Sequence, residues 1–241
     1  DFVSYDPDAH TLELAIPHGM GKQNVALSER ESKLELKKYG IEVPEEYVVT
    51  EKDQLDEIEI EYPVAAKIVS PDILHKSDVG GVKLNIQNRE ELRVAFDEVI
   101  YNAKSHCPDA QIDGVLVNRM LPPGVEVIVG VNNDPQFGPM VLCGLGGVFV
   151  EVFKDAALYP APLNREEALH MIQSLKGYKL LSGYRGGKEG DVEALADLVV
   201  QVAGYAAENK DTLAELDINP VFVYPKGEGV AMADALIVKR R

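Results

Sequence analysis

Cysteine is scarce in this chain: its 241 residues include only two, Cys107 and Cys143. The pair follows no metal-ligand spacing and builds no disulfide framework of the kind that small secreted proteins need. A reducing compartment is therefore expected, and we expect the protein in the cytoplasm.

Positive charge is also in short supply. Lys and Arg number 24 against 40 Asp and Glu, for a formal net charge of -16. This balance argues against nucleic acid as a partner, because the phosphate backbone needs a basic face. It also disfavours an anionic membrane surface. A protein this acidic that binds ATP or ADP must supply local positive charge from a few lysines, backbone amides and a metal ion.

Long apolar runs are missing as well. None reaches the roughly 20 residues that a membrane-spanning helix needs, no secretory signal is visible, and no internal repeat stands out. The chain begins at Asp1 rather than Met. This leaves open whether it is a separate subunit or a piece of a longer chain.

What the chain does have is an ordinary apolar share of 46% and a regular alternation of helix and strand patterns. Capping signals begin helices at Ser28, Asn88, Asn164 and Asp191, and a short acidic helix is expected after Thr50. Strands are expected at 46–50, 63–69, 82–86, 112–118, 125–131, 140–143, 148–153, 213–218, 221–224 and 230–238. The length and pattern predict one domain or two closely packed lobes, with residues 1–27 as a tail or the remainder of a preceding module.

The most informative stretch runs from Lys67 to Leu84. Lys67 is the single charge in an apolar strand, and a lysine there is expensive to bury without an anionic partner. The loop that follows holds His75, Ser77 and the pair Gly80-Gly81. Glycines let backbone N–H groups converge on an anion. The combination predicts a polyphosphate site, with His75 placed where it could meet the phosphate.

The C-terminal hairpin is the second informative place. Centring its turn on Gly227 puts Asn219 within about one residue of facing Asp234, by antiparallel pairing. Asp217 shares a strand face with Asn219 because the two are two residues apart. Oxygen-bearing side chains of this kind suit Mg²⁺ when phosphate completes the ligand set. The simpler reading, that Asp217 and Asn219 only cap a strand end before Pro220, does not account for Asp234.

Two weaker signals lie between these places. Asn118 to Leu121 breaks two apolar strands, where free backbone groups can read an adenine edge and Glu126 can bind ribose hydroxyls. A plain strand connection with a solvated Glu126 explains the pattern at least as well. The Gly144-Leu-Gly-Gly147 cluster, which includes Gly146, is either another phosphate-approach loop or simply a turn.

Four segments together resemble the signature of the NDP-forming acyl-CoA synthetases. They are His75–Val82, Gly130–Pro139, Gly144–Glu151 and Glu215–Pro220. Within that superfamily the chain is most similar to the ATP-grasp (beta) subunit or domain of the ADP-forming acetate–CoA ligases, which are related to succinyl-CoA synthetase. The resemblance covers roughly Ser28 to Val238. It does not extend to the first 27 residues, and Asn118 replaces the Glu that many ATP-grasp proteins place at the hinge.

The resemblance implies an ATP-grasp fold with nucleotide between two α+β lobes. The small lobe would span about 44–118, and the large lobe 28–43 plus 119–241. Carried over to this chain, Lys67 contacts the phosphates of ATP or ADP, and the loop holding Ser77, Gly80 and Gly81 closes over them. The backbone of Arg119, Met120 and Leu121 reads adenine, and Glu126 binds the ribose. Asn219 and Asp234 bind Mg²⁺, His75 is the phosphohistidine, and Asp217 steadies it.

The family reaction converts acyl-CoA, ADP and phosphate into a carboxylate, CoA and ATP. Only the nucleotide half of that chemistry is evident here, so we expect a CoA-binding (alpha) subunit or domain as partner, in a heterotetramer if the chains are separate. Two other readings stay open: the non-catalytic synthetase-like module of a protein acetyltransferase, and an ATP-grasp carboxylate–amine ligase, which needs no loop histidine. The acyl group and the choice between adenine and guanine nucleotides stay open too.

Overall fold

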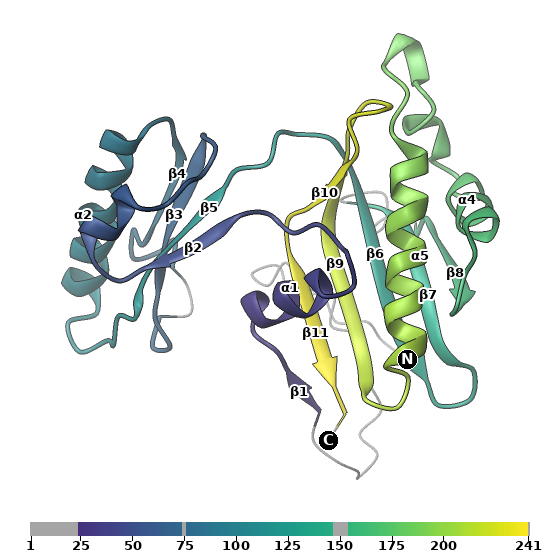
Figure 1. The fold of residues 1–241 in the computed structure, drawn as a ribbon, viewed down its shortest axis with the longest axis horizontal. Helices are drawn as coiled ribbons and strands as arrows, with labels where there is room; N and C mark the ends of the chain where they lie inside the picture. The colour runs from purple at the N-terminus through teal and green to yellow at the C-terminus, as the bar shows by residue number, and fades with distance from the viewer. Residues whose placement is uncertain (1–23, 74–75, 147–153, 241) are drawn as a thin grey trace.

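The computed structural model describes residues 24–73, 76–146 and 154–240, and in these the chain forms two sheets with separate cores. We call the four-stranded sheet with its helix, residues 46–119, the small lobe, and the seven-stranded sheet with its helices the large lobe. The two stand side by side in Figure 1. Two connections, residues 38–45 and 120–124, join them.

The small lobe orders its strands β2-β5-β3-β4, and every pair is antiparallel. Its elements are β2 (Glu46–Val49), β3 (Val64–Val69), β4 (Val82–Ile86), α2 (Arg89–His106) and β5 (Gly114–Arg119). Helix α2 begins at the predicted cap, where the Asn88 side chain accepts the N–H of Glu91. Its apolar residues at helical spacing, among them Leu92, Phe96 and Val99, are buried against the sheet, as predicted.

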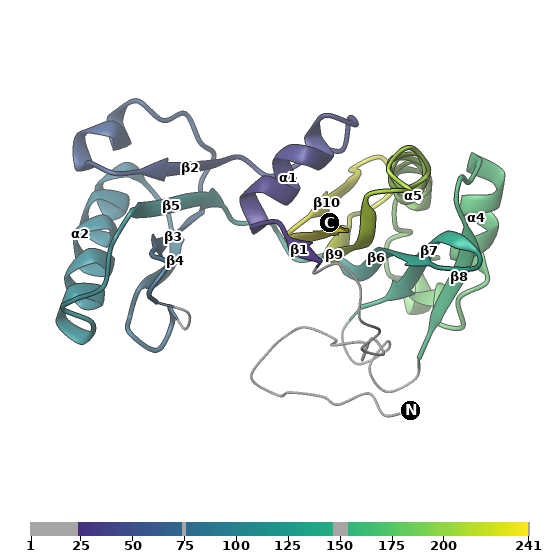
Figure 2. The ribbon, with the colours of Figure 1, turned by 90° about the horizontal axis from the view of Figure 1, so that it is seen from below.

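The large lobe orders its strands β1-β11-β9-β6-β7-β8, with β10 pairing β9, again all antiparallel. The strands are β1 (Val25–Ala26), β6 (Val125–Asp134), β7 (Gly138–Leu145), β8 (Ala156–Pro160), β9 (Leu213–Val223), β10 (Val230–Met232) and β11 (Ala235–Lys239). Helices α1 (Glu29–Lys37), α4 (Arg165–Gln173) and α5 (Val192–Glu208) lie on one face of this sheet (Figure 2).

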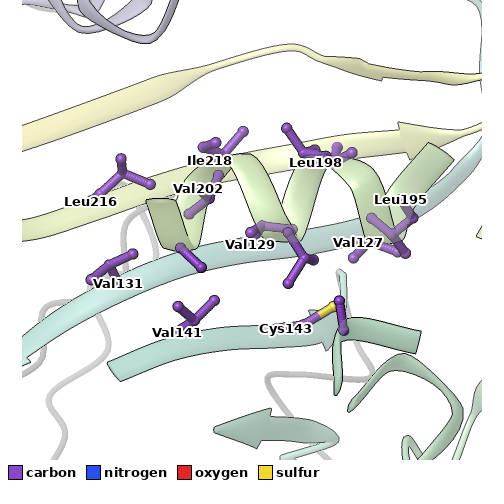
Figure 3. Packing of buried hydrophobic residues seen from close by; sticks show 14 of the residues in the cluster. Val127, Val129, Val131, Val141, Cys143, Leu195, Leu198, Val202, Leu216 and Ile218 are labelled. Atoms are coloured by element: carbon purple, nitrogen blue, oxygen red, sulfur yellow. The ribbon is translucent and has the colours of Figure 1, made fainter. Parts of the chain in front are cut away.

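The core of the large lobe forms where α5 packs on the central strands. Figure 3 shows Leu195, Leu198 and Val202 of α5 above Val129 of β6 and Cys143 of β7. Cys143 is fully buried, and burial raises the pKa of its thiol to about 12. The thiol therefore behaves as a small apolar side chain rather than as a nucleophile.

Three sequence-based predictions need correction, and a fourth is not tested. The acidic stretch after Thr50 forms only a short 3₁₀ turn, Lys52–Asp56, because Leu55 is the only residue of that turn that is buried. The stretches 213–218 and 221–224 form one strand, β9, whose register against β6 shifts between Val127 and Val129. The stretch 230–238 breaks into β10 and β11 at Ala233 and Asp234. The strand predicted at 148–153 lies outside the described residues.

The predicted tail, residues 1–27, includes residues that belong to the large sheet. Val25 and Ala26 pair with Lys239 and Val238 of β11, and the N–H of Leu27 donates to the carbonyl of Ile237. In the part of the chain that the structure describes, no helix is both long and apolar enough to cross a membrane.

Asp191 joins the start of α5 to the turn between β9 and β10. Its carboxylate, 8% exposed as a residue, accepts the N–H groups of Ala194, Gly227 and Gly229. Burial opposes ionisation, but these three N–H groups and Lys226 outweigh it and lower the pKa of Asp191 below its ordinary value. Asp191 therefore stabilises the fold most in its charged form.

We expect Asp191→Asn to lower the free energy of unfolding by about 1–3 kcal/mol, because a charged acceptor of three N–H groups becomes neutral. Urea titration at several pH values measures this. Because the pKa is lower in the folded state, the stabilising term is fully present above pH ~4 and is lost as pH falls further toward the folded pKa. The gap between variant and native protein should therefore narrow in acid. Asp197→Asn, an exposed acid on the same helix, should leave stability nearly unchanged, and an equal loss in both variants would contradict the assignment.

Candidate functional site

A cavity of about 210 Å³ opens between the two lobes. The small lobe contributes its walls from β3, β4 and β5, and the large lobe from α1, β9 and the segment before β11. The lining residues are Glu29, Lys33, Pro44, Ala65, Lys67, Leu84, Asn118, Arg119, Met120, Leu121, Phe222, Ala233 and Asp234. Five residues predicted from the sequence therefore share one cavity: Lys67, Arg119, Met120, Leu121 and Asp234.

One part of the cavity wall is apolar. Ala65 and Leu84 reach it from the small sheet, Met120 and Leu121 from the connection, and Phe222 from the large sheet. Apolar side chains that approach from two sides make a slot for a flat, weakly polar group such as a nucleobase.

Some backbone N–H groups of this connection already donate hydrogen bonds within the protein. The N–H groups of Arg119 and Met120 donate to the carbonyls of Glu45 and Pro63, at 3.2 and 2.9 Å. Among hydrogen bonds between described residues, none uses the N–H of Leu121. Donors for a base edge are thus fewer than the sequence predicted, with Leu121 the one that stays available.

Lys67 supplies positive charge to the cavity. It lies on β3 between the buried residues Ala66 and Ile68, while its own side chain is half-buried and reaches the cavity wall. Its charge favours the ionised forms of Glu29 and Asp234, although it is the smallest of the influences on each. Lys67 therefore lies close enough to carboxylates of the large lobe to share an anionic ligand with them.

The predicted pairing of the C-terminal hairpin is confirmed. The N–H of Asn219 donates to the carbonyl of Asp234 at 3.2 Å, and the next pair in register is Ile218 with Ala235. Asp234 follows the break between β10 and β11, so its side chain is free to line the cavity. Asn219 is adjacent to it, and Asp217 lies two residues along β9 opposite Gly130 and Leu236.

Both acids of this hairpin hold their protons more firmly than usual. Burial and the neighbouring charge of Glu215 raise the pKa of Asp217 to about 6. The Asp234 side chain is exposed to solvent, yet partial loss of hydration in the cleft and the carboxylate of Glu29 raise its pKa to about 7. Each carboxylate therefore gains from a cation placed beside it.

The donor set at the hairpin fits a hard cation. Asp234 offers carboxylate oxygens and Asn219 an amide oxygen, and Mg²⁺ prefers one or two such ligands with the rest from phosphate and water. Among the described residues there is no group of three or more His, Cys, Asp or Glu side chains that could hold a metal by themselves.

The glycines of the loop after β3 shape the loop itself. Gly80 has φ +64°, and a Cβ on Gly81 would lie 2.8 Å from a methyl carbon of Ile68. Their N–H groups donate to the carbonyls of Ser77 and Lys76 at 3.0 and 2.8 Å. Ser77 is exposed, and none of the three lines the cavity. In this arrangement the N–H groups are not available to phosphate, contrary to the simplest reading of the sequence.

Six more predicted residues lie away from the cavity walls or outside the described residues, and two of them are Asp217 and Asn219 of β9, which the lining does not include. Gly146 packs against Glu126: its N–H donates to the Glu126 carbonyl at 2.7 Å, and a Cβ would meet the Glu126 side chain at 2.9 Å. Glu126 is exposed and pairs with Phe222, which does line the cavity. His75 and Gly147 lie outside the described residues.

Glu29 and Lys33 of α1 are cavity residues that the sequence analysis missed. Leucines are the residues of this helix that would be expected inside, but Leu34 is 50% exposed while Lys33 is only 4% exposed. The signal was the Glu29–Lys33 spacing of four residues, which places an ion pair on one side of a helix. Nothing in the sequence pattern distinguished that side of the helix from a solvated one.

Comparison with known proteins gives a consistent result. The profile of the ATP-grasp domain family matches residues 19–238. The beta subunit of acetate–CoA ligase [ADP-forming] I from Pyrococcus furiosus is 51% identical over 204 residues, which is 84% of this chain and 88% of that protein.

Solved structures agree with the sequence relatives. The acetyl-coenzyme A synthetase ACD1 of Ca. Korarchaeum cryptofilum, in complex with coenzyme A, superposes with a TM-score of 0.79 at 45% identity, and the match covers 89% of this chain and 93% of that one. A second structure of that synthetase, with coenzyme A and Mg-AMPPCP, gives 0.75 at 44% identity with the same coverage. Its phosphohistidine segment is described as pointing towards the nucleotide-binding site.

Proposed function

This chain belongs to the ATP-grasp family, and we propose on that premise that it is the nucleotide-binding beta subunit of an ADP-forming acetate–CoA ligase. Its reaction moves a phosphoryl group between a histidine and ADP. The observation that carries the proposal is the single cavity in which Lys67 of the small lobe and Asp234 of the large lobe meet, beside an apolar slot.

Each side chain then has a part in the transfer. Lys67 holds phosphate oxygens. Asn219 and Asp234 would hold Mg²⁺, which would offset the charge that builds up as the phosphoryl group moves. Leu121 and the carbonyls of Arg119 and Met120 meet the base, and Glu126 meets the ribose. Predicted nucleotide contacts also include Ser77, Gly80, Gly81 and Gly146, which do not line the cavity, and Gly147, which lies outside the described residues.

The histidine step is a nucleophilic relay. A ring nitrogen of His75 carries the phosphoryl group, an oxygen of the terminal phosphate of ADP attacks the phosphorus, and the P–N bond breaks to leave ATP and free imidazole. Asp217 takes the position beside the phosphohistidine. Burial and the charge of Glu215 raise its pKa to about 6. A positively charged imidazole beside it would therefore stabilise its ionised form.

The remaining half of the reaction needs a partner. A CoA-binding alpha subunit supplies the phosphoryl group from acyl-CoA and phosphate, and two copies of each chain make a heterotetramer. The naming of the Pyrococcus furiosus relative as a beta subunit supports a separate partner. The free thiols of Cys107 and Cys143 support a cytoplasmic location.

Calorimetry on the isolated chain tests the proposal. We expect ADP to bind with an affinity that rises on addition of Mg²⁺, and we expect no turnover of acetyl-CoA until a partner subunit is added. Absence of Mg²⁺-dependent nucleotide binding would refute the cavity as the site. Full activity of this chain alone would refute the assignment as half of an enzyme.

A further inference from the structure

Lys33 forms ion pairs with one carboxylate of the large lobe and one of the small lobe. The ammonium lies 2.5 Å from an oxygen of Glu29, four residues before it on α1, and 3.3 Å from an oxygen of Glu46 on β2. Its side chain is 6% exposed and that of Glu46 is 12% exposed. The pair bridges the first connection between the lobes, residues 38–45.

Glu29 carries this link onward to the proposed metal site. Its carboxyl group lies close enough to that of Asp234 for each to act on the other's pKa, and both residues line the cavity with Lys33. A continuous row of charged groups thus runs from Glu46 through Lys33 and Glu29 to Asp234. The other charge that acts on both Glu29 and Asp234 is Lys67, from the far side of the cavity.

A buried ammonium between two carboxylates is a demanding arrangement. Ions lose hydration when buried, and the loss is offset only by close, well-placed partners. Such a row is a weak source of stability, but it restrains geometry, because moving either carboxylate away takes one of two partners from the buried ammonium. Here the groups that it fixes are the small-lobe strand β2 and the carboxylate of Asp234.

We propose that Lys33 is a positioning residue for Mg²⁺-nucleotide binding: by holding Glu29 and Glu46 together, it sets Asp234 and the small lobe at a fixed separation. The nucleotide must touch Asp234 through its metal and the small lobe through Lys67 and the slot, so this separation determines whether both contacts form at once. The inference rests on the proposed function for the identity of the ligand.

Three variants of the full chain separate positioning from simple electrostatics, with Mg²⁺-dependent ADP binding by calorimetry as the readout. Lys33→Met removes the ammonium and should weaken Mg·ADP binding by about tenfold or more, the ratio for roughly 1.4 kcal/mol. Lys33→Arg can hold both carboxylates and should stay within about threefold of the native protein. Glu46→Leu removes the tie across the lobes along with a negative charge.

Glu46→Leu gives opposite results under the two explanations. Electrostatics alone predicts tighter binding of the anionic nucleotide, because a carboxylate near the cavity is lost. Positioning predicts weaker binding, again by about tenfold. Tighter or unchanged binding in Glu46→Leu would overturn the inference.

Lys239→Met is the matched control. Lys239 lies on β11, and its ammonium is 2.6 Å from a carboxylate oxygen of Glu35, which is on α1 like Lys33. The Lys239 side chain is 31% exposed. We expect this variant to lose stability in urea as Lys33→Met does, yet to bind Mg·ADP within about threefold of the native protein. Equal losses of binding in both variants would reduce Lys33 to a structural role. Failure of the native chain to bind Mg·ADP would instead refute the proposed function, so the two failures are distinguishable.

Discussion

Replacement of His75 by alanine is expected to abolish conversion of acyl-CoA, ADP and phosphate into ATP when the partner subunit is present. Without a ring nitrogen there is no atom on this chain to accept the phosphoryl group, so the relay stops rather than slows. ADP binding should be nearly unchanged, because the groups assigned to ADP are Lys67, Asn219 and Asp234. Coupled assay of ATP formation measures the first effect and calorimetry the second.

The partner's own half of the reaction serves as the internal control. Release of CoA from acyl-CoA and phosphate should survive His75→Ala, because that step does not use this chain's histidine. Retention of ATP synthesis above about a hundredth of the native rate would show that His75 is at most an acid–base helper, whose loss costs about 10²–10⁴-fold. The native chain should also carry an acid-labile, base-stable phosphate that the variant lacks.

Replacement of Asp234 by asparagine, or of Asn219 by alanine, is expected to weaken Mg²⁺-dependent ADP binding by about 10- to 100-fold. Asp234→Asn replaces a charged carboxylate by a neutral amide, and Asn219→Ala removes an amide oxygen. The two residues face each other across the hairpin, where the Asn219 N–H donates to the Asp234 carbonyl at 3.2 Å. That backbone bond does not involve either side chain, so the hairpin should stay intact. Binding of ADP without Mg²⁺ should change little, and comparing calorimetric titrations with and without the metal measures the difference.

Glu228→Gln is the appropriate control for the hairpin variants. Glu228 lies in the turn of the same hairpin with a 61% exposed side chain, so its neutralisation changes local charge without touching the cavity. Native Mg²⁺ dependence in Asp234→Asn together with native activity would place the metal elsewhere.

The helices were largely predictable from the sequence because their caps and apolar spacing agree. Asn88, Asn164 and Asp191 each cap the helix that the pattern assigned to them. Strand β9 was not recognised as one element because Pro220 reads as a strand end. The structure instead accommodates Asn219 and Pro220 by a shift of register against β6.

The candidate site was predictable where a polar residue interrupts an apolar strand. Lys67 and Asp234 stand out in this way, and both line the cavity. Lys33 does not stand out, because a lysine on an amphipathic helix is normally solvated and its burial depends on Glu46, a partner from the other lobe. The same limit applies to the backbone N–H groups of Gly80 and Gly81, whose partners only the folded loop reveals.

The order of strands in the large sheet bears on how the chain folds as it leaves the ribosome. The small lobe is built from one contiguous stretch, so its sheet and α2 can form while the rest is still being synthesised. Helix α1 is made before the small lobe but packs on β11, the last strand, where Ser32 Oγ accepts the N–H of Ile237 at 3.0 Å. A nascent chain halted before Ala235 should therefore contain a folded small lobe and a large lobe in which α1 has not yet packed on β11.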